Sequence, residues 1–288
     1  MYFTKMIEHL VLSGAATNAL VQVGLIHNLL DTNVFKMENI KSVYATSAGA
    51  MIAVMLLIGA PIIDQKEYLI NRPWDKFFVP NLNFQTGIFD SHHVYNIIKP
   101  FMDANDIPET FTLLDLYTKT GVDLHIFTTK INGLELIDLN YVTFPSITIR
   151  EAILMTASIP FLFPPIQYEN EYYVDGSMTN KCPLQTIHTK SYDKDTILVI
   201  DITFDLLLYT PQASMLDLMQ IMINNLLYIV SADERNTLCM DEYKYYYRVV
   251  SDELNTETWQ SYMTNIEYRK QLHEKGYNFK KIEMNLPD

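Results

Sequence analysis

Ala45-Thr46-Ser47-Ala48-Gly49 joins a short strand-like run, residues 40–44, to an apolar helix-compatible run, residues 50–57. This order predicts a sharp strand-to-helix turn with a serine at its apex, although the usual first glycine of such a turn is Ala45 here. A serine in that place exposes its hydroxyl beside the first N–H groups of the helix. Ser47 is therefore a candidate nucleophile, and the Ala48 N–H is placed to stabilise an oxyanion. An ordinary helix N-cap serine gives the same local pattern, so the rest of the chain must separate the two interpretations.

The composition indicates a folded globular protein that does not bind nucleic acid. Hydrophobic residues make up 49% of the 288 residues and charged residues 19%. The formal net charge is −13 and the pI is near 4.9. Nucleic-acid binding requires basic patches, so this charge argues against it. The same charge disfavours strong docking on anionic lipid and leaves zwitterionic lipid as a surface to consider.

The cysteines and the apolar stretches indicate a protein of the cytoplasm or of membrane surfaces. Cys182 and Cys239 lack metal-ligand spacing and are interpreted as reduced core thiols. The charge-free stretches 9–30 and 43–63 are each interrupted by a turn-like cluster, which favours buried strand, turn and helix over a membrane span. Lys5 is followed closely by an acidic residue, which is atypical of a signal peptide. We expect a cytoplasmic or peripheral protein with no signal peptide and no transmembrane helix.

The first sixty residues predict the fold class. Residues 10–12 form a strand-like run that leads through a Ser-Gly turn into a helix over about 18–30. A second strand, about 40–45, and a second helix, about 48–59, repeat this order. Two such units indicate an α/β fold with a three-layer arrangement, in which a mostly parallel central sheet has helices on both faces. We expect one domain over residues 1–288.

Later segments extend this plan. Strands are expected at 124–128, 134–138, 172–174 and 196–203, and a short helix at 148–158. An aromatic segment, 64–90, is either a covering layer over the sheet or a mobile lip that touches lipid. Apolar residues then recur at helical spacing and predict one buried helix face. These residues are Met215, Leu218, Met222, Leu226 and Val230.

Two further segments supply partners for the candidate nucleophile. Asp175-Gly176-Ser177 follows a strand, and an aspartate there would accept the serine proton directly, which gives a Ser–Asp dyad. Ser13-Gly14-Ala15-Ala16 stands between the first strand and the first helix. A loop in that position presents N–H groups to the space above Ser47, as an oxyanion hole requires.

Four blocks in this order resemble the patatin-like phospholipase family. They correspond to its glycine-rich loop with first helix, its nucleophile elbow, its Ile-Pro-x-Phe-Pro-Pro segment and its Asp-Gly-Gly…Asn-x-Pro segment. The blocks are LVLSGAATNALVQVGLI (10–26), YATSAGAM (44–51), TASIPFLFPPI (156–166) and YYVDGSMTNKCPL (172–184). Together they cover about residues 10–205, with 206–288 as a helical and strand-containing C-terminal part of the same domain.

The resemblance implies a lipid acyl hydrolase, either a phospholipase A or a lipid esterase, that works through an acyl-enzyme. Its substrate would be a phospholipid or a neutral lipid, met through transient contact with a membrane surface. The dyad needs no cation, so we expect no cofactor and no metal. The implied site residues are Ser47 as nucleophile, Asp175 as base, Gly14, Ala15, Ala16 and Ala48 around the oxyanion, and Gly49 and Gly176 as the glycines of the elbow and of the dyad loop.

The oxyanion loop departs from the family pattern. The usual Gly-Gly-Gly-x-Arg-Gly is Gly-Ala-Ala-Thr-Asn-Ala here, residues 14–19. An alanine forced to positive φ would cost about 1–2 kcal/mol, so we expect the loop to take a different path. Asn18 in place of the arginine removes an anchor for a phosphate or for the loop. Because Ser47 and Asp175 are both present, we expect a working hydrolase of reduced rate.

Two alternatives remain open. The chain would be a binding or structural protein if the altered loop has lost catalysis while the patatin fold persists. It would be an α/β-hydrolase with a Ser-Asp-His triad if His188 or His273, which both follow Asp175, completed the site. That fold places its elbow after several strands, whereas Ser47 follows only about the second, which disfavours the triad.

Overall fold

The computed structural model describes residues 5–80, 87–238 and 240–280. Within these residues one eight-stranded sheet has the order β5-β6-β3-β2-β1-β7-β8, and β4 pairs with β3. The strands are β1 His9–Leu12, β2 Ser42–Thr46, β3 Asp123–Lys130, β4 Glu135–Leu139, β5 Ile166–Tyr168, β6 Glu171–Asp175, β7 Ile197–Thr203 and β8 Tyr245–Val250. The helices are α1 Ala19–Asp31, α2 Ala48–Leu57, α3 Ile62–Asn71, α4 Trp74–Phe77, α5 His92–Ala104, α6 Leu113–Thr120, α7 Ile149–Thr156, α8 Leu184–His188, α9 Met215–Thr237, α10 Thr256–Thr264 and α11 Ile266–Tyr277.

The sheet is parallel where the chain alternates strand and helix. β3, β2, β1, β7 and β8 run parallel to one another, whereas β4 and β6 pair antiparallel with β3, and β5 pairs antiparallel with β6. Leu10 of β1 lies opposite Val43 of β2 on one side and Leu198 of β7 on the other. The carboxyl ends of these parallel strands meet at one edge, which is where open α/β sheets form their sites.

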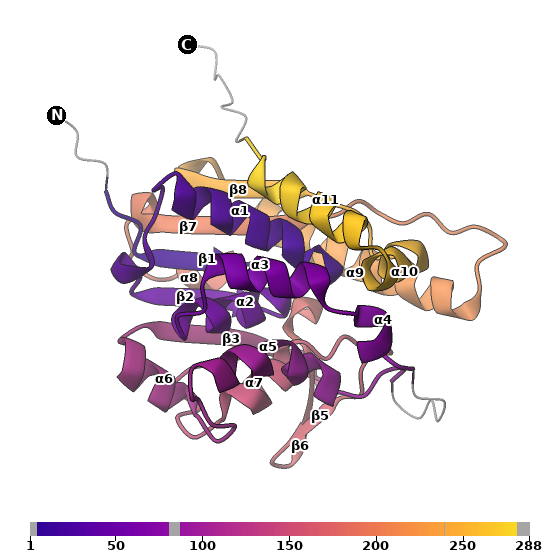
Figure 1. Ribbon diagram of the computed structural model, residues 1–288, viewed down its shortest axis with the longest axis horizontal. Helices are drawn as coiled ribbons and strands as arrows, with labels where there is room; N and C mark the ends of the chain where they lie inside the picture. Colours follow the sequence, from indigo (N-terminus) through magenta and orange to yellow (C-terminus); the bar gives the residue numbers. More distant parts are fainter. Residues whose placement is uncertain (1–4, 81–86, 239, 281–288) are drawn as a thin grey trace, which may run out of the picture.

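Helices cover both faces of the sheet, as the sequence predicts. Successive strand residues belong to different hydrophobic clusters, because side chains alternate across a sheet. Leu10 and Leu12 contribute to the cluster under α1, α2, α3 and α5, whereas Val11 lies in the cluster on the opposite face, beside α8. Figure 1 shows α1, α3 and α11 side by side over one face of the sheet. The predicted three-layer α/β class is confirmed.

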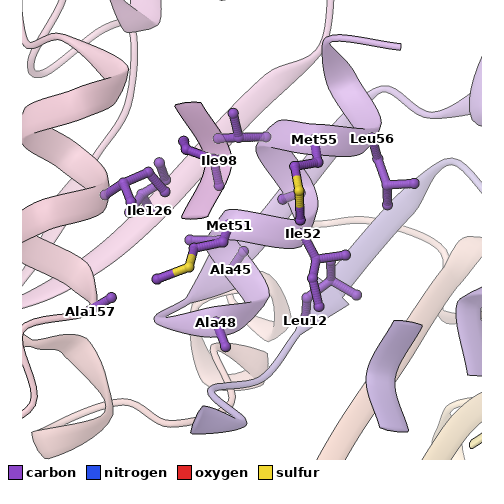
Figure 2. Close-up of a cluster of buried hydrophobic side chains, with 14 of the residues drawn as sticks. Leu12, Ala45, Ala48, Met51, Ile52, Met55, Leu56, Ile98, Ile126 and Ala157 are labelled. Carbon is purple, nitrogen blue, oxygen red and sulfur yellow. The ribbon is translucent and has the colours of Figure 1, made fainter. Parts of the chain in front are cut away.

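Helix α2 is buried along its whole length and fixes the turn that precedes it. Its sequence contains no charged residue, and all of its residues are buried, as expected for a helix that is apolar on every side. Figure 2 shows Met51, Ile52 and Met55 of this helix packed among Leu12 of β1, Ile126 of β3 and neighbouring side chains. Truncating a residue such as Ile52 to alanine would cost about 2–5 kcal/mol of stability. The residue at the start of α2 is therefore held by a rigid element.

The prediction for α9 was wrong about which face is buried. Four of the five residues expected inside are exposed, with Met215 at 78% and Met222 at 58% of full accessibility. Ile223 and Leu227 are buried instead, with Asn224 between them. Apolar residues occur on two stripes of this helix, so their spacing predicts a helix without identifying the stripe that packs inward.

Helix α9 is also the one described helix that is long and apolar enough to cross a membrane. This stretch is Met215–Asp233, and only 17% of it is buried. One helix of this kind is weak support for a membrane span.

Two other expectations are resolved by burial. Trp74 and Phe78 are 1% and 8% exposed, so the described part of the aromatic segment is a covering layer over the sheet. Residues 81–86, which include Phe84, lie outside the described residues. Cys182 is 5% exposed, in agreement with a core position, and Cys239 lies outside the described residues.

Candidate active site

Ser47 occupies a strained turn between β2 and α2. Its backbone has φ 53° and ψ −124°, in the positive-φ region that residues other than glycine rarely adopt. The Ser47 N–H donates to the Thr156 hydroxyl oxygen at 2.9 Å, and the Thr156 hydroxyl donates to the carbonyl oxygen of Phe127. This chain of bonds ties the turn to α7 and β3. The expected strand-turn-helix geometry is present, with the serine side chain at its apex.

The structure brings Ser47 and Asp175 together. The Ser47 hydroxyl donates to Asp175 Oδ2 with an Oγ–Oδ2 distance of 2.6 Å. Asp175 ends β6, and its other carboxylate oxygen, Oδ1, accepts the Ser177 N–H at 2.8 Å. The backbone N–H of Asp175 donates to the Ser158 carbonyl oxygen at 2.9 Å. The carboxylate is thus fixed from both sides and oriented toward the serine.

Burial changes the acidity of this carboxyl group. Asp175 is only 2% exposed, and burial raises its pKa to about 6. Hydrogen bonds from Ser47 and Ser177 and the positive charge of Lys181 oppose this rise. A carboxylate with a raised pKa is a stronger base than an ordinary aspartate and remains ionised near neutral pH.

Lys181 is a site residue that the sequence reasoning missed. Its side chain is 2% exposed and lines the small cavity that contains Ser47 and Asp175. Its Nζ donates to the Ile202 carbonyl oxygen and lies 3.9 Å from Asp201 Oδ1. The only signal in the sequence is a lysine a few residues after the Asp-Gly dipeptide, and nothing local indicates that its charge is buried.

The loop before α1 offers a different set of amides from the one expected. The Gly14 N–H donates to the Lys181 carbonyl oxygen at 2.8 Å, so this expected donor is engaged elsewhere. Within the described residues, the N–H groups of Ala15 and Ala16 donate to no protein acceptor. Ala48 is the first residue of α2, and the first N–H groups of a helix have no acceptor inside that helix. Ala15, Ala16 and Ala48 all line cavities that contain Ser47.

The expectation that this loop avoids positive φ is wrong at one residue. Ala16 has φ 46°, whereas Ala15 has φ −138°. The loop therefore keeps a left-handed residue although the family's glycine is absent, at a cost of about 1–2 kcal/mol. Tertiary contacts on both sides of the loop explain why the strain persists, because the buried residues Gly14 and Asn18 fix its two ends.

Asn18 anchors the loop where the family has an arginine. Its Nδ2 donates to the Asp252 carbonyl oxygen at 2.8 Å, and its Oδ1 accepts the Ser251 hydroxyl at 2.8 Å. Asn18 is 1% exposed, so this amide is committed to the segment after β8. The substitution keeps an anchor for the loop and removes a positive charge.

Two glycines permit close packing around Ser47 and Asp175. A Cβ on Gly49 would lie 2.6 Å from the carbonyl oxygens of Leu12 and Ser13. A Cβ on Gly176 would lie 2.1 Å from the carbonyl oxygen of Phe127. Neither distance is compatible with a side chain, so larger residues here would displace the Ser47 turn or the Asp175 loop.

An apolar cavity of about 80 Å³ adjoins Ser47. Ser47, Ala48, Met51, Trp74 and Phe163 are among the residues that line it. The lining residues with a polar side-chain atom are Thr17, Ser47, Trp74, Trp259 and Tyr262. The remaining lining residues are Ala16, Ala19, Ile52, Met55, Leu69, Phe78, Val94, Ile97, Ala157 and Ile159. Such a lining suits a hydrocarbon chain. Phe163 lines this cavity, whereas Phe161, two residues earlier, is 51% exposed.

No histidine completes a triad. None of the chain's seven histidines, all of them within the described residues, lines either cavity that contains Ser47. His188 Nδ1 lies 3.0 Å from the Tyr243 hydroxyl, and His273 Nε2 lies 3.4 Å from His27 Nδ1. The two histidines named in the triad alternative are therefore engaged away from Asp175.

Comparisons with solved structures agree with this architecture. VipD from Legionella pneumophila aligns with a TM-score of 0.53 and 15% identity, over 94% of this chain and 67% of that chain. The type III effector ExoU of Pseudomonas aeruginosa aligns with a TM-score of 0.50 and 16% identity, over 95% of this chain and 52% of that chain. At these identities the likeness concerns the fold.

Two viral proteins are similar in sequence. The "Probable lipid hydrolase 463L" of Invertebrate iridescent virus 6 is 26% identical over 208 residues, which is 69% of this chain and 70% of that protein. The "Uncharacterized protein R571" of Acanthamoeba polyphaga mimivirus is 26% identical over 200 residues, 69% of this chain and 65% of that protein. The family model for patatin-like phospholipase matches residues 10–187, well over half of the chain. With the turn, the carboxylate and the fold in agreement, this match means that the chain belongs to the patatin-like phospholipase family.

Proposed function

We propose that this chain hydrolyses acyl esters of lipids, with Ser47 as nucleophile and Asp175 as general base. The observation that carries the proposal is the 2.6 Å hydrogen bond from Ser47 Oγ to a buried carboxylate, beside an apolar cavity. Family membership and the similarity to a protein named as a probable lipid hydrolase support the reaction class.

The proposed reaction has two half-reactions. Asp175 accepts the hydroxyl proton while Ser47 Oγ bonds to the acyl carbon, and the carbonyl oxygen becomes an oxyanion. The N–H groups of Ala15, Ala16 and Ala48 are the donors for that oxyanion. Collapse of the tetrahedral species breaks the ester bond, and the departing alcohol takes the proton from Asp175. Water then gives a proton to Asp175 while its oxygen bonds to the acyl carbon. The bond between Ser47 Oγ and the acyl carbon breaks, Ser47 Oγ takes the proton back from Asp175, and the fatty acid leaves.

The apolar cavity is the proposed acyl subsite. Its wall includes Ser47, several residues of α2 and Trp74, so an acyl chain placed there lies beside the attacking oxygen. Apolar side chains hold the acyl chain in this cavity, and no cation or cofactor takes part in the proposed steps. Phospholipids and neutral lipids both supply such a chain.

The experiment is hydrolysis of phosphatidylcholine in mixed micelles, with fatty acid and lysolipid measured by mass spectrometry. The expected result is activity in the natural chain and a loss of about 10⁴-fold or more in Ser47→Ala and in Asp175→Asn. A soluble short-chain ester, assayed in parallel, reports the chemistry without an interface. Correctly folded protein that hydrolyses neither substrate would favour a patatin-fold binding or structural protein.

A further inference from the structure

An exposed apolar surface, here called the α9 face, covers the outer side of α9 and the loop before it. In Figure 1, α9 lies near α10, and the loop before α9 extends beyond this end of the sheet. The side chains of the α9 face are between 42% and 84% exposed, a concentration of apolar residues seldom left open to water. They are Leu206, Leu208, Tyr209, Met215, Leu218, Met222, Leu226 and Ile229.

The opposite side of α9 is fixed to the protein. Ile223 and Leu227 are buried in a cluster with Phe204 and Leu254. Asn224 is fully buried, and its side chain donates to the Asp205 carbonyl oxygen at 3.0 Å and accepts the Leu254 N–H at 3.2 Å. A helix bound in this way on one side and apolar on the other is suited to lie in an interface rather than to cross it.

Hydrogen bonds also hold the loop beside the helix. Asn225 Nδ2 donates to the Leu207 carbonyl oxygen at 2.9 Å, and Asn225 Oδ1 accepts the Leu207 N–H at 2.8 Å. This pair of bonds fixes the backbone between Leu206 and Leu208, whose side chains are 48% and 84% exposed. These two hydrogen bonds thus hold the loop in a conformation that leaves both leucine side chains exposed.

The charge of the α9 face indicates which kind of lipid surface would bind it. Asp217 is the only charged residue between positions 206 and 232, in a chain of net charge −13. Its carboxylate accepts the Ser214 N–H at 2.9 Å and the Thr256 hydroxyl, so it serves as part of the helix cap. A nearly uncharged face on an acidic protein matches zwitterionic lipid, whereas anionic lipid would repel the molecule.

The α9 face borders a groove that lies next to the candidate active site. A groove of about 760 Å³ lies between Met215 and Met219 of α9 and the exposed Phe161. Met178 lines this groove and also lines the small cavity that contains Ser47 and Asp175. The groove beside the α9 face and the cavity of the candidate nucleophile therefore share a wall at Met178.

We infer that the α9 face docks this protein on the surface of a zwitterionic lipid bilayer and positions the groove at Met178 to receive a lipid from it. The inference rests on the proposed function for the identity of the lipid as substrate. The apolar side chains of the face enter the boundary between head groups and acyl chains, while the buried stripe of α9 keeps the sheet above the surface.

The test is co-sedimentation with phosphatidylcholine vesicles, in the Ser47→Ala background so that the lipid stays intact. Met222→Glu combined with Leu226→Glu places two charges on the α9 face, and neither residue lines a cavity that contains Ser47. We expect the vesicle partition coefficient to fall by about tenfold or more. The matched control is Leu114→Glu with Val142→Glu, two exposed apolar residues away from this face, which should leave the partition coefficient unchanged. Vesicles rich in phosphatidylserine should bind less protein than phosphatidylcholine vesicles.

Three results would overturn the inference. They are binding by the Met222→Glu, Leu226→Glu variant equal to that of the control, no binding by the Ser47→Ala parent, or a dimer in light scattering that this variant dissociates. The last result would assign the face to a second copy of the chain. Hydrolysis of a soluble short-chain ester distinguishes failure of docking from failure of the proposed function, because it requires the dyad and no bilayer. In a second Met222→Glu, Leu226→Glu variant that retains Ser47, loss of vesicle hydrolysis with soluble-ester hydrolysis retained supports docking.

Discussion

The Gly14 N–H donates to the carbonyl oxygen of Lys181, so the loop before α1 and the segment after Asp175 are joined directly. The same lysine sends its buried side chain into the cavity of Ser47 and Asp175. Its charge favours the ionised carboxylate of Asp175, and burial of that carboxylate opposes ionisation. Lys181 thus contributes both to the geometry of this loop and to the electrostatics of the Ser47–Asp175 pair.

The rate should depend on pH through Asp175. The carboxyl group must be ionised to accept the serine proton, and its pKa is raised to about 6. We expect kcat/KM for a soluble ester to rise with pH around a midpoint near that value and to level off above it. Stopped-flow measurement of acylation across the pH range checks this; a rate that is flat from pH 5 to 8 would argue against Asp175 as base.

Lys181→Met should move that midpoint upward. The methionine keeps most of the side-chain volume and removes the charge that lowers the pKa of Asp175. We expect the loss of kcat/KM to be larger at pH 5.5 than at pH 8. A purely structural defect would lower the rate equally at both pH values, and circular dichroism of the variant controls for folding.

Asp175→Asn should stabilise the protein at alkaline pH. The pKa of Asp175 is higher in the folded state than its ordinary value of 3.8, so the folded state holds this proton more tightly. The tighter binding of this proton stabilises the folded state at low pH, and that stabilisation is lost as the pH rises through about 6. We expect the variant to be more stable than the natural chain by about 1–3 kcal/mol at pH 8, with a smaller difference at pH 4.5, in urea unfolding. Equal differences at both pH values would contradict the assigned pKa.

The strained loop gives a matched pair of glycine substitutions. Ala16 has φ 46° and Ala15 has φ −138°, so only the first position gains from a glycine. We expect Ala16→Gly to keep or raise the free energy of unfolding by up to about 1 kcal/mol and Ala15→Gly to lower it by about 0.5–1 kcal/mol. Thermal unfolding of the two variants side by side tests this. An equal loss of stability in both variants would rule out the left-handed conformation of Ala16.

The histidines should be dispensable for chemistry. His188 contacts Tyr243 and His273 contacts His27, away from both Ser47 cavities. We expect His188→Ala and His273→Ala to retain kcat on a soluble ester, although replacing the buried His273 lowers stability. A selective loss of kcat in either folded variant would restore the triad interpretation.

The sequence predicts those parts of the site that depend on local order along the chain. A serine between a strand and an apolar helix, and an aspartate at the end of a later strand, follow from residue patterns, as does the mostly parallel sheet. The α9 face and the charge of Lys181 do not, because burial depends on which elements pack against each other. Ala16 shows the same limit: local propensity disfavours positive φ, yet anchors at Gly14 and Asn18 impose it.

The most direct measurement is the site of reaction with a fluorophosphonate, which bonds to an activated serine oxygen. Intact-protein mass spectrometry followed by peptide mapping should find a single adduct on Ser47, and Ser47→Ala should carry none while retaining its circular dichroism spectrum. A folded natural chain that takes up no probe, or an adduct that persists in Ser47→Ala, would contradict the assignment of Ser47 as the nucleophile activated by Asp175.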